Sequence, residues 1–89
     1  MKLSVQVLVC GRVQGVGFRY SSYRQASHLR LGGWVRNLDD GRVEVFASGE
    51  KSQIEKFVQW LHHGPEQAAV EEISISWRDY TKIHSFLIR

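Results

Sequence analysis

The chain has 89 residues, of which 43% are hydrophobic and 24% are charged, a composition typical of one globular domain. A chain of this length is too short for two domains. It buries only about 60–65% of the surface that its unfolded form exposes, which excludes a deep, enclosed substrate chamber. We therefore expect a single domain spanning residues 1–89, with a shallow site for a small ligand.

The basic residues are unevenly distributed. The net charge of +3 combines +6 from residues 1–38, which contain no acidic residue, with −3 from residues 39–89. The basic residues of the first segment are Lys2, Arg12, Arg19, Arg24, Arg30 and Arg36. This segment is suited to an anion, which could be nucleic acid or a small anionic substrate. Arg24 and Arg30 also fit a solvated helix face.

The cysteine count and the first residues bear on location. One cysteine, Cys10, permits neither an intramolecular disulfide nor a cysteine-based metal site, and it is interpreted as a packing residue. The chain starts without a signal-peptide pattern, and no apolar run approaches the ~18 residues of a membrane span. We expect a cytoplasmic monomer with no membrane partner. The scattered histidines predict neither a metal site nor a general base.

The first half of the chain predicts a strand, a glycine loop, a helix and a hairpin. Residues 3–10 alternate as a strand with one buried face, and three glycines then interrupt residues 11–17. A helix starting at Phe18 is predicted to stop at Gly32-Gly33. Residues 34–38 and 42–47 form two short alternating runs around an Asp-Asp-Gly turn, which is typical of a hairpin.

The second half predicts another helix and one or two strands. Apolar residues at 54, 57, 58 and 61 share one helical face, which ends before Gly64-Pro65. Ser48 or Gly49 is a candidate cap for this helix. Residues 73–77 alternate as a fourth strand, and residues 83–88 could add a short fifth.

This element order, β-α-β-β-α-β, predicts an α+β fold: a ferredoxin-like sandwich of an antiparallel sheet and two helices. In this topology the first and second strands run parallel with the third between them, about 10 Å apart. The end of the second strand therefore returns to the level of the glycine loop. Because Val35 and Asn37 share one face, a buried Val35 would direct Asn37 toward the start of the first helix.

The glycine loop is a candidate anion site. A glycine-rich turn before a helix presents backbone N–H groups and the positive end of the helix dipole to one point. Arg19 lies in the first helical turn, where the dipole disfavours a cation, so a bound phosphate or carboxylate would explain it better than helix stability. The chain contains no Gly-Lys pair for a Walker A loop and no complete dinucleotide fingerprint, which argues against a nucleoside triphosphate.

Two segments carry a resemblance to a known family. Residues 11–19 read GRVQGVGFR, and residues 33–44 read GWVRNLDDGRVE. These segments, their separation, the chain length and the element order resemble the acylphosphatase family over essentially the whole chain. The resemblance implies a hydrolase of the mixed anhydride between a carboxylate and a phosphate, with no metal and no cofactor.

The resemblance also implies roles for individual residues. Arg19 would be the phosphate-binding catalytic residue, and Asn37 would orient the attacking water. The phosphate-binding loop would comprise Gln14, Gly15, Val16, Gly17 and Phe18. A carboxylate leaves without a general acid, and the loose transition state of phosphoryl transfer needs mainly positioning and charge stabilisation. Inorganic phosphate or sulfate would then compete with the substrate. Without the motif, Asn37 would be interpreted as a turn residue.

Two other functions fit parts of the pattern. A ferredoxin-like nucleic-acid-binding module would use the basic first half and the aromatics, but the third strand lacks an RNP1-type segment, and only Phe46 could stack on a base. A regulatory domain that binds a small anion without turnover would need the loop but not Asn37. We therefore favour the enzyme, with a small acyl phosphate as its partner and no nucleic acid.

Overall fold

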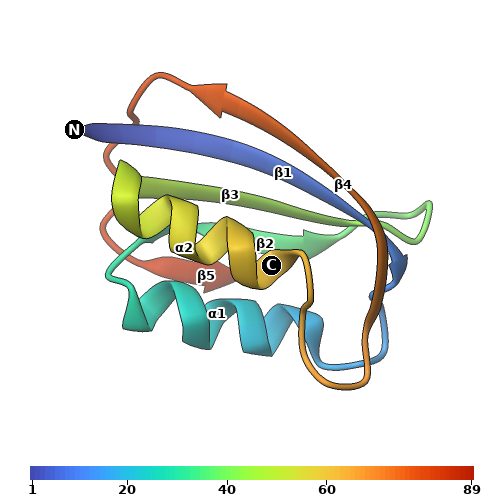
Figure 1. Cartoon of the computed structure of the whole chain (residues 1–89). Coiled ribbons are helices and arrows are strands. Elements are labelled where there is room, and N and C mark those ends of the chain that lie inside the picture. The colour runs from blue at the N-terminus through green and yellow to red at the C-terminus, as the bar shows by residue number, and fades with distance from the viewer.

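The computed structural model describes all 89 residues as a five-stranded sheet with two helices on one face (Figure 1). The elements in chain order are β1 (Lys2–Arg12), α1 (Phe18–His28), β2 (Gly32–Asn37), β3 (Val43–Glu50), α2 (Lys51–Leu61), β4 (Ala69–Arg78) and β5 (Phe86–Ile88). The predicted element order and the short fifth strand are confirmed, and the fold is a ferredoxin-like α+β sandwich. Neither helix is long and apolar enough to cross a bilayer.

The predicted antiparallel pairing is confirmed for β1, β2, β3 and β4, and the short fifth strand makes the sheet mixed. The strand order is β4-β1-β3-β2-β5, and only β5 pairs in parallel, with β2. β4 ends at the end of the sheet where β2 begins, so a strand that follows it there runs in the direction of β2. The connection is tied down on the way: the Thr81 N–H donates to Ser4 Oγ (2.9 Å) and the Gly33 N–H to the Ser85 carbonyl (3.0 Å).

The core lies between the sheet and the two helices. Val5, Val7 and Val9 of β1 are fully buried, as their alternation predicts. The predicted apolar face of α2 is confirmed, since Ile54, Phe57, Val58 and Leu61 are its buried residues. Burial of these side chains, at about 25 cal/mol per Å² of apolar surface, is the main force that holds the helices against the strands. This packing fixes the level at which β1, β2 and α1 meet.

Helix α1 ends differently from the prediction. Its stop is Arg30, in the left-handed region with φ 59°, where the Arg30 N–H bonds the Ser27 carbonyl and the Leu31 N–H bonds that of Ala26. The glycines expected to stop the helix belong to β2. A Cβ on Gly32 would lie 1.9 Å from the Ile83 oxygen, so glycine is required there for close backbone approach.

The start of α2 also departs from the prediction. Glu50 precedes the helix, and no side chain caps it. Instead, the Lys51 N–H bonds the Met1 carbonyl (2.9 Å). Ser48 lies within β3 and its buried hydroxyl pairs with that of Ser4 (2.6 Å), which removes it from capping. Gly49 likewise belongs to β3.

Candidate active site

The glycine loop connects β1 to α1 through two left-handed residues. Gly15 has φ 74° and Gly17 has φ 79°, and a Cβ at either position would meet no atom within 4 Å. Glycine is therefore needed because the backbone adopts a positive φ, and not because a larger side chain would clash with a neighbour. Gly17 precedes α1, whose first turn has no side-chain cap and no acidic residue. The first N–H groups of the helix are thus left for a ligand.

Gln14 ties the loop to the β2–β3 hairpin. Its side-chain amide donates to the carbonyls of Leu38 (2.8 Å) and Arg42 (3.0 Å), which flank the hairpin turn. These bonds hold the loop beside the end of β2, where Asn37 lies. The structure thus gives the Gln14 side chain a positioning contact, directed at backbone carbonyls.

The hairpin turn is itself ordered by a local carboxylate. Asp40 accepts hydrogen bonds from the Arg42 N–H (3.1 Å) and from Arg42 Nε (2.9 Å). The backbone N–H of Arg42, followed by its guanidinium, holds the pKa of Asp40 below its ordinary value. The interpretation of Asp40 as a turn former agrees with this geometry.

Phe18 anchors the start of α1, and Arg19 projects from it. The Phe18 side chain is 1% exposed, and its ring lies 5.8 Å from that of Trp60 on α2, measured between centroids. Arg19, one residue further along, is exposed, and its Nη1 donates to the Arg89 oxygen at 3.1 Å. The core thereby fixes the helix end from which the guanidinium extends.

Asn37 is the last residue of β2 and is half-buried. Val35, two residues earlier on the same face, is fully buried beneath the helices. Asn37 therefore faces the helix side of the sheet, as predicted, at the level of the glycine loop. Its amide offers both a donor and an acceptor.

These elements enclose a shallow hollow of about 230 Å³. It is lined by Val13, Gly15, Gly17, Phe18, Arg19, Tyr20, Asn37 and Ile88. The structure thus brings Gly15, Gly17, Phe18, Arg19 and Asn37 together, whereas Gln14 and Val16 do not line the hollow. Val13, Tyr20 and Ile88 also line the hollow and were not predicted from the sequence. For Ile88, the only signal in the sequence was the possible short strand over residues 83–88. Its place beside the hollow depends on the pairing of β5 with β2.

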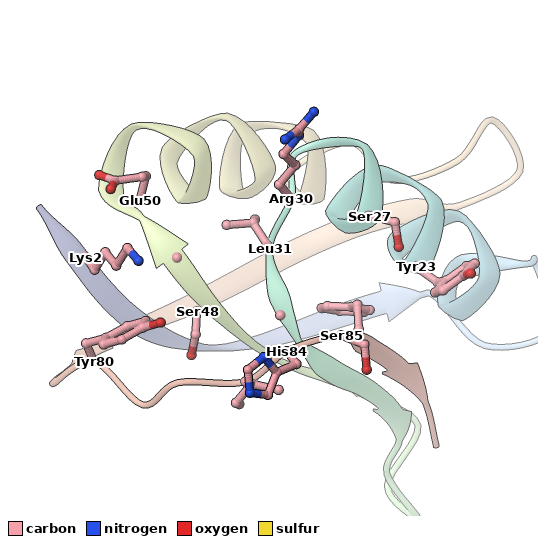
Figure 2. Close-up of a pocket in the computed structure, with 14 residues that line it drawn as sticks. Lys2, Tyr23, Ser27, Arg30, Leu31, Ser48, Glu50, Tyr80, His84 and Ser85 are labelled. Atoms are coloured by element: carbon pink, nitrogen blue, oxygen red, sulfur yellow. The ribbon is translucent and has the colours of Figure 1, made fainter.

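A larger hollow, of about 550 Å³, lies near the opposite end of the sheet (Figure 2). No residue of the glycine loop lines it. In Figure 2 the guanidinium of Arg30 points away from this hollow. The Glu50 carboxylate accepts a hydrogen bond from the Met1 ammonium group at 3.1 Å. Lys2 Nζ lies 5.6 Å from the centroid of the Tyr80 ring. The charged groups around this larger hollow do not converge on one point. We therefore place the site at the smaller hollow, beside the glycine loop.

Other side chains with chemical potential lie apart from the site. Cys10 is half-buried, on the face of β1 opposite Val9. No group of three or more histidine, cysteine, aspartate or glutamate side chains is arranged to hold a metal ion.

Known proteins resemble this chain in both sequence and fold. Residues 5–88 match the sequence profile of the acylphosphatase family. The chain is 45% identical over 87 residues to the acylphosphatase of Trichormus variabilis, across 98% of this chain and 86% of the relative. The acylphosphatase structure from Coxiella burnetii matches with a TM-score of 0.95 at 40% identity, across 99% and 93% of the two chains. That from Bacillus subtilis matches with a TM-score of 0.94 at 41% identity, across 98% of each chain.

The fold and the hollow together define a class: a ferredoxin-like sandwich with an uncapped helix start beside an arginine. The match over nearly the whole length is more specific than this class. The chain belongs to the acylphosphatase family. Its members are hydrolases that act on acid anhydrides. The predicted hydrolysis of acyl phosphates is confirmed at the level of the family.

Proposed function

We propose that this protein, acting as one domain over residues 1–89, hydrolyses the carboxyl–phosphate bond of small acyl phosphates without a metal ion or cofactor. The products are a carboxylate and inorganic phosphate. The observation that carries the proposal is the convergence of Arg19, the start of α1 and Asn37 on one shallow hollow. Arg19 and Asn37 are the proposed catalytic residues.

Phosphate binding is assigned to the loop and Arg19. The backbone of residues 14–18 and the first N–H groups of α1 would surround the phosphoryl oxygens, and Arg19 would add a fixed positive charge. The guanidinium has five N–H donors, of which one bonds the Arg89 oxygen, so two parallel donors remain for the phosphate. This arrangement supplies positive charge that a metal ion supplies in other phosphoryl-transfer enzymes.

Asn37 is assigned the attacking water. Its carbonyl can accept a hydrogen bond from the water and its amide can donate one, so the side chain can orient the water in line with the leaving group. An oxygen of the phosphoryl group then accepts the proton of the water. The carboxylate leaving group has a low pKa and departs without a general acid, consistent with a hollow that no aspartate or glutamate lines.

The remaining partners follow from the site. Inorganic phosphate or sulfate should compete with the substrate for the same donors. One chain contains the whole site, so a monomer suffices for turnover. Nucleic acid is not a proposed partner, because on the helix-free face Arg36 pairs with Glu44 (2.7 Å) and also lies over the Trp34 ring. Phe46 stacks on that same ring. A single cysteine is compatible with the reducing cytoplasm.

The rate of hydrolysis of a small acyl phosphate, measured in excess EDTA, tests the proposal. We expect full turnover under chelation, and a much lower rate on a simple phosphate monoester, whose alkoxide leaving group needs a general acid. Activity that disappears with EDTA and returns with a divalent ion would contradict the metal-free mechanism. A labelled-RNA shift run beside it tests the nucleic-acid alternative, which predicts binding without turnover.

A further inference from the structure

The hollow at Arg19 contains more than a phosphate and a water require. The glycine loop and Arg19 are assigned the phosphoryl oxygens, and Asn37 is assigned the attacking water. An acyl phosphate also brings its acyl group into the site, because that group is bonded to a phosphoryl oxygen. The lining residues left to contact it are the apolar ones, Val13, Phe18, Tyr20 and Ile88.

Exposure divides these four residues into two pairs. Val13 and Phe18 are each 1% exposed, so they pack in the core and present almost no surface to a ligand. Tyr20 is 58% exposed and Ile88 is 44% exposed. Tyr20 and Ile88 are therefore the two residues of the hollow with apolar surface free to contact the acyl group.

The direction of attack distinguishes Tyr20 from Ile88. In phosphoryl transfer the attacking and leaving oxygens lie roughly in line, on opposite sides of phosphorus. Asn37 ends β2, and Ile88 belongs to β5, where it pairs with Val35 of β2. Tyr20 instead comes from α1, one residue after Arg19. A water held at the sheet directs the leaving group toward the helix, and so toward Tyr20.

Tyr20 presents its ring from a well-fixed backbone. It lies in the first turn of α1, which the buried Phe18 anchors to the core. Its ring lies 6.2 Å from that of Tyr23, between centroids, at a tilt of 34°. Tyr23 is one turn further along the helix and restricts the ring on that side. A ring held in this way loses little conformational freedom when a ligand packs against it.

We propose that Tyr20 determines which acyl groups are preferred, because its ring contacts the acyl group and selects a flat, apolar group over a short aliphatic one. This assignment rests on the hydrolysis proposed above. An aromatic acyl group would bury apolar surface on both partners and could adopt a stacked or edge-to-face geometry with the ring. An acetyl group offers the ring only one methyl group.

The ratio of kcat/KM for benzoyl phosphate to that for acetyl phosphate measures this selectivity. Tyr20→Ala should lower the ratio about three- to tenfold, the effect of one aromatic contact. The intrinsic reactivities of the two substrates cancel, because wild type and variant are measured with the same pair. The loss should lie mainly in KM for benzoyl phosphate, since the ring contacts the acyl group in the ground state and the transition state alike. Tyr20→Phe keeps the ring and should keep the ratio.

Stable analogues test the same contact without turnover. Benzoylphosphonate and acetylphosphonate carry the two acyl groups on a carbon–phosphorus bond in place of the anhydride. In isothermal titration, Tyr20→Ala should weaken the binding of benzoylphosphonate relative to acetylphosphonate by the same factor. A wild-type chain that hydrolysed neither acyl phosphate would contradict the proposed function, while the titration would still test the contact with Tyr20.

Tyr80→Ala is the matched control. Tyr80 is a partly exposed tyrosine of the larger hollow, away from the glycine loop, so its loss should leave the ratio and the phosphonate affinities unchanged. A ratio that changes by less than about twofold in Tyr20→Ala would overturn the proposal. A loss in Tyr20→Phe as large as that in Tyr20→Ala would also overturn it. Selectivity lost in Ile88→Ala but kept in Tyr20→Ala would place the acyl group at the sheet, against the proposal.

Discussion

Arg19 and Asn37 reach the same hollow from different elements, and their proposed roles can be separated. Arg19 contacts the phosphoryl oxygens in the ground state and the transition state alike, so Arg19→Ala should weaken phosphate binding and turnover together. Asn37→Ala removes only the orientation of water. It should leave phosphate affinity near wild type while kcat falls by about 10²-fold or more.

Phosphate titration and kcat on one acyl phosphate measure this pair, with circular dichroism to confirm folding. If Asn37→Ala retained wild-type kcat, or lost phosphate binding as severely as Arg19→Ala, Asn37 would be a turn residue and not the residue that orients water.

The two loop glycines permit a second test at this scale. Gly17→Ala meets no steric obstacle, but it places a side chain at φ 79°, so the loop must shift and its N–H groups must move away from the ligand. We expect phosphate affinity to fall at least about tenfold, a loss of about 1.4 kcal/mol in binding. Isothermal titration with phosphate measures this change.

Gly41→Ala is the matched control for the loop. Gly41 also has a positive φ, of 96°, and open space around its Cβ position, but it lies in the hairpin turn outside the hollow. It should lose comparable stability and keep phosphate affinity. Equal losses of affinity in both variants would show that general destabilisation explains the effect.

The residues of the site were predictable where the local sequence determines them. Arg19 follows a glycine loop at a helix start, and the period of β2 places Asn37 on the helix side. Tyr20 and Ile88 were not predictable, because their places depend on how helix and strand pack around the hollow. The contacts of Gln14 depend on the fold in the same way: its partners lie on a hairpin more than twenty residues away.

At the scale of elements, Glu44 joins three strands. From β3, its carboxylate accepts hydrogen bonds from Gln6 of β1 (2.6 Å) and Arg36 of β2 (2.7 Å), and the residue is only 7% exposed. Burial alone would raise the pKa of Glu44, but the hydrogen bonds from Gln6 and Arg36 outweigh it and hold the pKa below the ordinary 4.5. The ionised carboxylate therefore stabilises the native sheet.

This predicts a pH dependence of stability. Because the folded pKa is lowered, the contribution of Glu44 is present above pH 4.5 and is lost as the pH falls through the folded pKa. Glu44→Gln should lower the free energy of unfolding by about 1 kcal/mol at pH 7, and the difference from wild type should shrink in acid. Urea unfolding at several pH values measures it. A difference that stays constant down to pH 3 would rule out this role for the ionised carboxylate.

The elements themselves were predicted by periodicity, and their ends were not. The apolar face of α2 and the alternation of β1 depend on local pattern, and both are confirmed. The ends depend on contacts with distant segments: Ser48 bonds Ser4, and Gly32 lies against residue 83. Such contacts are invisible to local patterns, which explains the misplaced helix stop and cap.

At the scale of the whole molecule, a ligand that binds only the folded state raises stability. Inorganic phosphate should do so through the loop and Arg19, by about 2.7 kcal/mol at a hundredfold excess over its dissociation constant. Thermal unfolding with and without phosphate measures the effect, with Arg19→Ala as the control. Equal stabilisation of that variant, or none of the wild type, would place the anion elsewhere.

In the proposed reaction, water oriented by Asn37 attacks the phosphorus atom held by Arg19 and the glycine loop. Hydrolysis of an acyl phosphate in water enriched in heavy oxygen, with mass spectrometry of both products, tests this directly. Attack at phosphorus breaks the bond between phosphorus and the bridging oxygen, so the label should appear in inorganic phosphate and not in the carboxylate. Label in the carboxylate would mean attack at the carbonyl carbon, and it would contradict the roles given to Arg19 and Asn37.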